Sequence, residues 1–226
     1  MKCQRIVPNF RVRANERPFM AENPPDDIPS DIYDGLLQAT LSALVTHGYS
    51  NLTVRDIGDE WDRSRQLITY YFGGKEALLT TLLEDVLVVA EETIDSPPVG
   101  DPYEQLTETI DLLVCGPESM NTEYWRFLTA LYEIQAQAHH EPKYQTILDS
   151  ATDSFIEELT DCIERGIRDG VFRDVDAEQF ANAIDDQITG AHVKRIHLGR
   201  ADATAQTRRF LHDVIVEDLL LVFCRR

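Results

Sequence analysis

The stretch that decides the fold runs over residues 53–79 and reads TVRDIGDEWDRSRQLITYYFGGKEALL. Thr53, followed three residues later by Asp56, is a capping-box pattern and favours a helix start at this point. The pair Gly73-Gly74 favours a helix end, because glycine adopts the left-handed backbone that closes a helix. The spacing therefore predicts two short helices separated by a tight turn at Asp62-Arg63, with a third helix beyond the glycines.

Two short helices joined by a tight turn have the layout of a helix-turn-helix, whose second helix enters the DNA major groove. Ser64 can cap that second helix, and Leu67 or Ile68 can face the core. The side chains left for the outer face are Arg65, Gln66, Thr69 and Tyr70. Arginine and glutamine bond guanine and adenine edges through paired hydrogen bonds, so Arg65 and Gln66 are the predicted base readers.

Three pieces of this stretch also resemble one family in identity and spacing. They are Thr53-Val54-Arg55-Asp56-Ile57, then Ser64, then the run ITYYFGGKEALL from Ile68 to Leu79. With His47-Gly48-Tyr49 and Leu52-Thr53 before them, they resemble the TetR family of transcriptional regulators over about residues 33–83. The resemblance implies DNA contacts at the matching positions, which are Thr53, Arg55, Arg63, Ser64, Arg65, Gln66, Thr69, Tyr70, Tyr71 and Lys75.

Three positions depart from the family pattern. Asp62 stands where the family has glycine, and aspartate tolerates such a turn better than most residues. Arg63 replaces an apolar residue, so we expect it to point to solvent or phosphate while Trp61 fills the space. Thr69 replaces a tyrosine, so Tyr70 or Tyr71 is expected to take over that phosphate contact, with core packing as the alternative for both rings.

The rest of the chain also predicts an all-α fold, because sustained apolar alternation and hairpin dipeptides are missing from the sequence. Residues 1–29 contain five prolines and no periodic apolar pattern, and are expected to form a disordered tail. We expect a helix-turn-helix domain at 30–80 and a helical regulatory and dimerisation domain at 81–226. The predicted helices outside the opening stretch cover about 30–48, 75–95, 103–115, 120–139, 143–169, 176–197 and 203–224.

The segment Gly170-Val171-Phe172-Arg173-Asp174-Val175-Asp176, followed by a long helix, resembles the regulatory domain of the BetI-like branch of the family. The family implies a homodimer in which the last two helices pair with their twofold mates. Dimer contacts are then expected at Ile188, His192, Leu211, Ile215 and Leu219. The family also implies a cavity for an unidentified small-molecule effector. The aromatic-rich helix carrying Tyr124, Trp125, Leu128 and Tyr132 is one candidate lining, and plain helix packing explains it equally.

The formal net charge is −19, and at first sight it argues against binding a polyanion. The charge is unevenly distributed, however, with a net +1 in residues 1–29, −3 in residues 30–80 and −17 in the remainder. Lysine occurs four times and the acidic residues number 40, a balance that resembles proteins from salt-loving archaea. In molar salt the Debye length is about 3 Å, so distant acids are screened and short contacts with DNA survive.

The sequence carries no signature of an enzyme such as GxSxG, GxxxxGK[ST], GxGxxG or HExxH. Cys3, Cys115, Cys162 and Cys224 are scattered without a CxxC pair and are expected to be reduced thiols. His139 and His140 are neighbours and cannot share one face of a helix, so no metal site is expected. We expect no cofactor, and a cytoplasmic protein without a membrane span, because apolar runs fall short of about 20 residues.

These observations predict a ligand-responsive DNA-binding regulator, most often a repressor in this family, acting as a homodimer on a palindromic double-stranded operator. The alternative is a helical module that binds a small molecule or a protein and whose helix-turn-helix no longer reads DNA. The acids around the reading helix, namely Asp56, Asp59, Glu60 and Asp62, favour that alternative slightly. An enzyme is the third and most distant interpretation.

Overall fold

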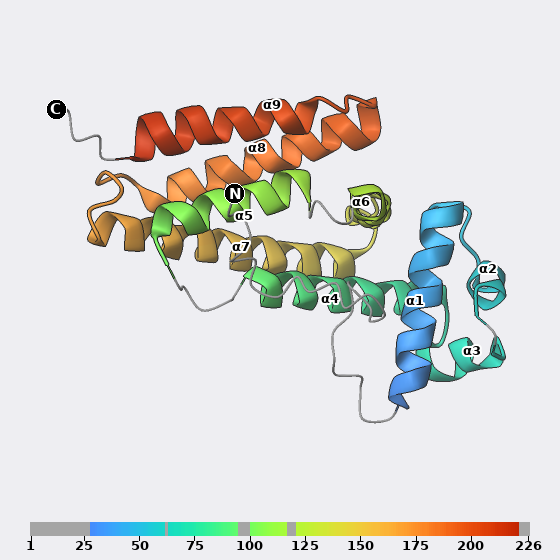
Figure 1. The fold of residues 1–226 in the computed structure, drawn as a ribbon. Coiled ribbons are helices and arrows are strands. Elements are labelled where there is room, and N and C mark those ends of the chain that lie inside the picture. The colour runs from blue at the N-terminus through green and yellow to red at the C-terminus, as the bar shows by residue number, and fades with distance from the viewer. Residues whose placement is uncertain (1–27, 62, 95–99, 117–120, 222–226) are drawn as a thin grey trace, which may run out of the picture. The chain divides into compact units, whose positions relative to one another are not determined.

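The computed structural model describes residues 28–61, 63–94, 100–116 and 121–221. These ranges contain nine α-helices and a final π-helical segment, and their single β-type pairing is an isolated bridge between Phe172 and Leu221 (Figure 1). The expected all-α class is confirmed. Most of the predicted tail and the turn residue Asp62 lie outside the described residues. None of the described helices combines the length and apolarity that a membrane crossing requires.

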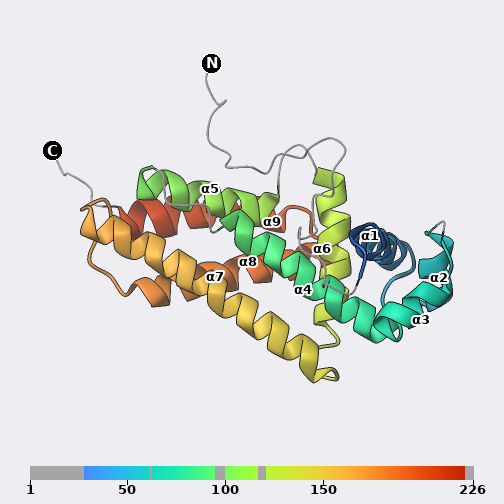
Figure 2. The ribbon, with the colours of Figure 1, turned by 90° about the horizontal axis from the view of Figure 1, so that it is seen from below.

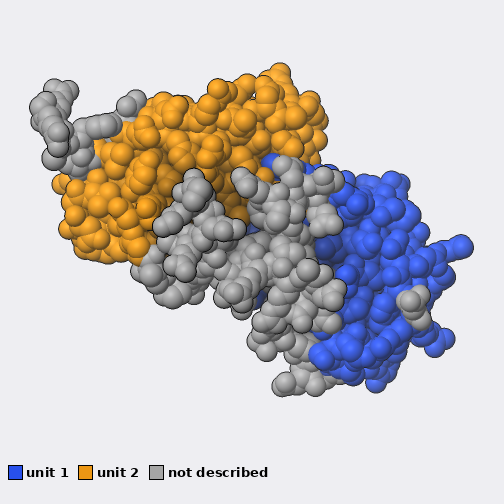
Figure 3. Space-filling view, in the orientation of Figure 1, with its two compact units in different colours: residues 1–93, 125–151 blue, residues 94–124, 152–226 orange. Residues whose placement is uncertain are grey.

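The chain divides into two compact units (Figure 3), which are residues 1–93 with 125–151 and residues 94–124 with 152–226. The first unit contains α1 (Ser30–His47), α2 (Val54–Asp59), α3 (Gln66–Phe72) and nearly all of α4 (Lys75–Ile94). Most of α6 (Asn121–Gln135) and the start of α7 (Pro142–Arg168) also belong to it. The second unit contains α5 (Pro102–Cys115), the rest of α7, α8 (Ala177–Leu198), α9 (Ala203–Phe210) and the π-helical segment η2 (Leu211–Leu220).

In the first unit, α1 holds the short helices through its buried face. Leu36, Leu37 and Leu44 are almost fully buried along this helix. The Tyr33 hydroxyl donates to buried Asp85 of α4 over 3.1 Å, and its ring centroid lies 6.3 Å from that of Phe72 at the end of α3. Burial, and then the charge of Asp85, raises the pKa of Tyr33, so the hydroxyl stays protonated and can donate.

In the second unit, the segment between α7 and α8 closes a single apolar core. Phe172 is almost fully buried and lies directly on Gly166 of α7, where an added Cβ would come within 2.1 Å of its ring. The Arg173 backbone N–H donates to the Leu220 carbonyl over 2.7 Å, and its side chain donates to the Leu221 carbonyl over 3.0 Å. The stretch after Gly170 therefore fixes the end of η2 against α7.

A charged cluster joins α5 to the last helix, which Figures 1 and 2 show running alongside it. Asp111 of α5 accepts two hydrogen bonds from Arg208, at 2.6 and 2.5 Å, and lies 2.7 Å from the His212 ring nitrogen. Partial burial raises the pKa of Asp111, but the hydrogen bonds from Arg208 and His212 outweigh it and hold that pKa below its usual value. This ionised carboxylate links two helices that are distant in sequence.

Most helix boundaries agree closely with those expected, because the residues that end the helices lie next to them in the sequence, whereas the helix expected at about 120–139 ends earlier, at Gln135. Gly48, Gly73, Gly116 and Gly170 have positive φ angles and follow the ends of α1, α3, α5 and α7. One difference is the last helix, which was expected to be uniform over 203–224. From Leu211 it widens into π-type turns, as the bond from the Leu221 N–H to the Val216 carbonyl shows. This wider turn brings four buried apolar side chains to one face, namely Leu211, Ile215, Val216 and Leu220.

Candidate nucleic-acid interface

Helix α2 begins with the capping box that the sequence predicted. The Thr53 backbone N–H donates to the Asp56 carboxylate over 2.9 Å, and the Asp56 N–H donates to the Thr53 hydroxyl over 3.3 Å. The Thr53 hydroxyl also donates to the same carboxylate over 2.6 Å. The hydrogen bonds from Thr53 lower the pKa of Asp56, which keeps this carboxylate ionised at the positive end of α2.

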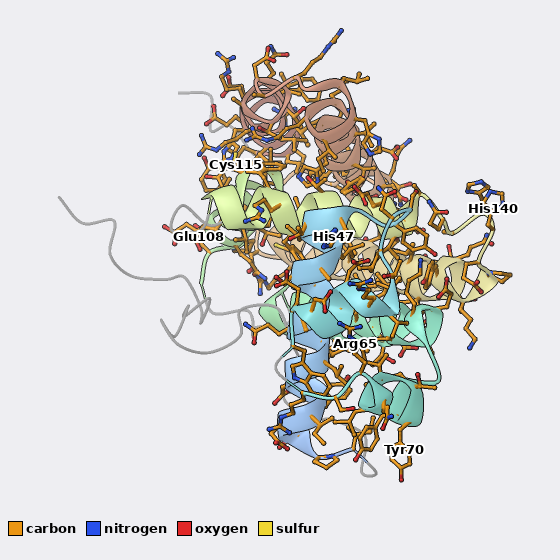
Figure 4. The ribbon with its side chains drawn as sticks, turned by 90° about the vertical axis from the view of Figure 1, so that its right-hand side faces the viewer. His47, Arg65, Tyr70, Glu108, Cys115 and His140 are labelled. Atoms are coloured by element: carbon orange, nitrogen blue, oxygen red, sulfur yellow. The ribbon has the colours of Figure 1, made fainter. Side chains whose placement is uncertain are left out.

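Helix α3 presents polar side chains outward and fixes its register through one buried residue. Ile68 is fully buried, while Gln66, Thr69 and Tyr70 are exposed, and Tyr70 has 78% of its surface accessible. Figure 4 shows Tyr70 projecting away from the ribbon. Tyr71 is half-buried and meets the Tyr70 ring edge-on, with centroids 4.8 Å apart. The exposed residues are those that a helix lying in a groove would use.

Helix α3 begins after Arg65 and ends at Gly73. The cap position is Arg65, whose side chain makes no capping bond, and the expected cap Ser64 lies one residue earlier, where its hydroxyl accepts a hydrogen bond from the Gln66 backbone N–H over 3.3 Å. Gly73 takes a left-handed conformation with φ of 76°, and its N–H donates to the Thr69 carbonyl. The seven-residue helix is therefore bounded at both ends by residues that the sequence singled out.

Each basic side chain of the predicted interface has an acidic partner. Arg55 pairs with Asp59 one turn along α2 at 3.7 Å, and Arg65 pairs with the same carboxylate. Arg63 donates to Asp31 of α1 over 2.8 Å. All three pairs are about half exposed or more, so each contributes little to stability. Their main effect is on the electrostatic potential of this face, because each guanidinium charge is largely balanced by a carboxylate.

Arg65 lies back across α2 (Figure 4). Its stem covers Gly58, where an added Cβ would come within 2.3 Å of the Arg65 Cγ atom. Its guanidinium ends at Asp59, so the side chain is turned away from the outer face that carries Gln66 and Thr69. In the structure Arg65 thus contacts α2, and its expected role as a base reader stays a prediction.

Lys75, at the start of α4, lies against the turn that follows α1. Its ammonium group is 5.0 Å from the centroid of the Tyr49 ring and 3.8 Å from Glu76, and its side chain is 20% exposed. The Tyr49 backbone N–H in turn donates to Glu133 of α6 over 2.5 Å. Lys75 thus stands at the edge of the face, held by a cation–π contact with the aromatic ring.

The four residues expected to line a pocket belong to different units. Tyr124 belongs to the second unit, where its hydroxyl donates to the Leu113 carbonyl over 3.1 Å and its ring covers Gly116. Trp125, Leu128 and Tyr132 belong to the first unit. An apolar hollow in that unit is lined by side chains of α1, α4 and α6, including Phe127 and Leu131 but not Leu128. The helix does line a hollow, through residues next to those expected.

Four of the five residues expected at a dimer interface are covered by their own chain. Ile188, His192, Leu211 and Ile215 are buried in the second unit, and the side chain of Leu219 lies outside the described set. Burial lowers the pKa of His192, whose ring faces the Leu113 and Val114 carbonyls of α5. These side chains pack against α5 and α7 of their own chain, and their place in a dimer interface stays a prediction. Val193, Leu198 and Phe210 are the large apolar side chains left exposed on α8 and α9.

The helix expected at about 120–139 was predicted to reach His139, but both His139 and His140 lie outside it. They lie in the turn after α6, with ring centroids 3.7 Å apart. Across the described part of the chain, no cluster of three or more His, Cys, Asp or Glu residues has metal-binding geometry.

Sequence reasoning named Asp59 only as one of the acids near the reading helix, and it missed Asp31, Glu133 and the contacts that all three make on this face. The Arg55–Asp59 pair was detectable, because residues four apart on a helix are neighbours. The contacts of Asp59 with Arg65, of Asp31 with Arg63 and of Glu133 with Tyr49 span turns or distant segments. Periodicity along the chain gives no signal for contacts of that kind.

The fold and the outer face of α3 define the class of protein, which is an all-helical chain with an N-terminal helix-turn-helix domain. Residues 36–82 match the family described as "Bacterial regulatory proteins, tetR family". The chain has the fold of TetR-family transcription regulators, and its helix-turn-helix domain is of the type that binds DNA. No curated protein is significantly similar to the chain.

Solved structures with this fold cover most of the chain. A TetR transcription regulator from Haloarcula marismortui is 28% identical, with a TM-score of 0.78, over 85% of this chain and 100% of its own. A putative transcriptional regulator from Saccharomonospora viridis, solved in complex with choline, is 22% identical, with a TM-score of 0.75, over 86% and 100%. A putative TetR-family regulator from a Rhodococcus species is 19% identical, with a TM-score of 0.66, over 80% and 95%.

Proposed function

We propose that this protein is a transcriptional repressor that binds a palindromic operator as a homodimer and responds to a small-molecule effector. In this proposal residues 30–80 bind DNA, and residues 81–226 bind the effector and form the dimer. The role is regulatory and not catalytic.

The observation that carries the proposal is the division of α3 into a buried anchor and an exposed reading face. Ile68 is fully buried, whereas Gln66, Thr69 and Tyr70 are exposed on a helix that begins after Arg65 and ends at Gly73. Any surface helix directs polar side chains to solvent, but Tyr70 also leaves a large aromatic ring 78% exposed beside Gln66 and Thr69. Gln66 reads adenine edges, and the hydroxyls of Thr69 and Tyr70 bond bases or phosphates.

A homodimer is supported by apolar side chains that the protomer leaves uncovered. Val193 and Leu198 on α8 and Phe210 on α9 are 39%, 63% and 42% exposed. Both helices belong to the second unit, as the pairing of the last two helices with their twofold mates requires. A twofold dimer matches two half-sites about one helical turn apart, or a little more.

Effector binding is supported by the aromatic helix α6, and the apolar hollow next to it, which has room for about one water, would have to widen to admit an effector. Trp125, Phe127 and Tyr132 come from α6, and Phe127 lines the hollow with side chains of α1 and α4. Occupation of that hollow would act on α1, to which the short helices α2 and α3 are attached. Aromatic faces attract quaternary ammonium groups, so choline, the ligand of the Saccharomonospora regulator, is a reasonable first compound.

The charge of −19 is proposed to be an adaptation to concentrated salt, because four lysines against 40 acidic residues resemble the composition of proteins from salt-loving archaea. The 28% identity to the Haloarcula regulator supports that setting. In concentrated salt the acids outside the interface are screened, so the short contacts of α3 decide binding.

One feature favours the alternative, a helical module that no longer reads DNA. Arg55, Arg63 and Arg65 are all paired with carboxylates of their own chain. A mobility-shift assay with the DNA upstream of the protein's own gene separates the two. The repressor proposal predicts a shift that shuffled DNA of the same length does not compete away. Equal competition by both DNAs at every salt concentration up to molar would favour the alternative.

A further inference from the structure

Asp59 contacts two arginines that come from different parts of the helix-turn-helix. Arg55 lies one turn earlier on α2, and Arg65 precedes α3. The Arg55, Asp59 and Arg65 side chains are 78%, 53% and 50% exposed, so solvent and a ligand can reach the group. One carboxylate therefore holds two guanidinium groups together on the surface of α2.

The course of Arg65 explains why the pair forms on α2. Gly58 leaves room for the Arg65 stem, and Asp59 binds the guanidinium beyond it. In a helix-turn-helix the first helix crosses the sugar–phosphate backbone while the second enters the groove. A side chain drawn onto α2 is therefore placed for a phosphate and not for a base edge.

Carboxylate and phosphate oxygens compete for guanidinium groups, because both accept paired hydrogen bonds from the same planar donors. An exposed carboxylate pair is weak, so a phosphate can replace it at little cost. After replacement, the carboxylate remains close to DNA without its partners, and its negative charge opposes that of the phosphate. Asp59 thus opposes binding both before and after the exchange.

Resting on the proposed DNA-binding function, we propose that Arg55 and Arg65 form one phosphate clamp and that Asp59 is its resident counter-charge, displaced by a DNA phosphate. Because a phosphate contact carries no base information, Asp59 weakens binding to every sequence by the same factor. It also moderates the salt dependence, because the freed carboxylate takes up a cation while the DNA releases cations. Base reading is left to Gln66, Thr69 and Tyr70.

The experiment compares wild-type protein with Asp59→Asn, which keeps the shape and removes the charge. Glu60→Gln is the matched control, because it removes the same charge one residue away from Asp59. The Glu60 carboxylate accepts a hydrogen bond from the Ser42 hydroxyl over 3.0 Å. Fluorescence anisotropy measures the affinity of each protein for its own upstream DNA and for a shuffled duplex of equal length. Salt is varied from about 0.1 to 1 M, over which the Debye length falls from about 10 to 3 Å.

We expect Asp59→Asn to bind both duplexes about three- to tenfold more tightly at the lowest salt, with their affinity ratio unchanged. Its plot of log K against log salt should be steeper by about one, and the gain should shrink toward molar salt. Glu60→Gln should have a smaller effect. A second variant, Arg65→Ala, should weaken binding to both duplexes by equal factors, and it remains informative if Asp59→Asn fails to fold.

Several outcomes would overturn the inference. An equal effect of Asp59→Asn and Glu60→Gln would show a general charge effect and not release of the arginines. A change in the affinity ratio with either Asp59→Asn or Arg65→Ala would place Arg65 on a base. Tighter binding by wild type than by Asp59→Asn would make Asp59 a support of the interface. If the wild-type protein shows no preference for its own upstream DNA, the proposed function is contradicted. The inference, which rests on that function, is then contradicted as well.

Discussion

At the residue scale, the proposed base recognition depends most on Gln66, the first exposed residue of α3. We expect Gln66→Ala to weaken binding to the operator by roughly 1–3 kcal/mol, the range for one paired contact with a base. Binding to a shuffled duplex should change little. Gln187→Ala, an exposed glutamine on α8, is the matched control. Equal losses on operator and shuffled DNA would move Gln66 to the phosphate contacts.

Single residues also show where sequence reasoning stopped. Thr53 and Asp56 form the predicted capping box, because both partners lie within one turn. Arg65 was expected on the reading face, but its stem packs over Gly58 and its guanidinium donates to Asp59, so the side chain contacts α2. Residue identity predicts a guanidinium donor at position 65, and whether that donor meets a base or a phosphate stays a prediction. Its direction depends on contacts across the turn, which a linear pattern does not encode.

At the element scale, the junction of α5 with the last helix should respond to acid. The pKa of Asp111 is lower in the folded chain than its usual value, because Arg208 and His212 outweigh the effect of burial. Such a group stabilises the fold above its unfolded pKa of about 3.8, and this contribution disappears as the pH falls through the lower folded pKa. We therefore expect the free energy of unfolding to decrease below about pH 4.

Urea unfolding at several pH values checks this expectation, with Asp111→Asn as the comparison. The variant should be less stable than wild type near neutral pH, and the difference should narrow in acid. Glu157→Gln, an exposed carboxylate on α7, is the control for general charge effects. A difference between wild type and Asp111→Asn that does not change with pH would mean that the carboxylate contributes through packing and not through its charge.

Elements were predicted well because their boundaries are local. The helix expected at about 75–95 is Lys75–Ile94, and the one expected at 103–115 is Pro102–Cys115. The faces of α8 were predicted less well. Ile184, Ile188 and His192 share one face, as their spacing indicates, but α5 and α7 of the same chain cover it. Periodicity shows which residues lie together and does not show what lies against them.

At the scale of the whole molecule, the dimer can be tested by a single exposed side chain. Phe210→Glu should give a monomer in light scattering, because it puts a charge among the apolar groups proposed to meet the partner. Val88→Glu, a similarly exposed side chain in the first unit, should leave the dimer intact. A dimer that survives Phe210→Glu at all concentrations would place the interface elsewhere.

A point substitution is a cleaner test than removal of the last helix. Leu211, Val216 and Leu220 are fully buried in the core of the second unit. Deleting residues 203–226 would remove these side chains, and the unit would unfold before its association could be measured. The altered mass would then reflect loss of the core and not loss of an interface.

The net charge of −19 is a property of the whole molecule, whereas recognition is local. Residues 30–80 carry only −3 of it, and the arginines there are balanced by Asp31 and Asp59. The three arginines of this segment therefore carry little unbalanced charge that could attract DNA from a distance. Short contacts from α3 must supply the specificity, and salt should weaken binding less than it does for a basic regulator.

Hydroxyl-radical footprinting of the upstream DNA tests the central claim most directly, because it locates a dimer of reading helices on the duplex. The account predicts two protected half-sites related by a palindrome, with centres about one helical turn apart or a little more. Protection should persist in concentrated salt and disappear with Gln66→Ala at the wild-type concentration. Uniform cutting across the fragment at every salt concentration would contradict the account.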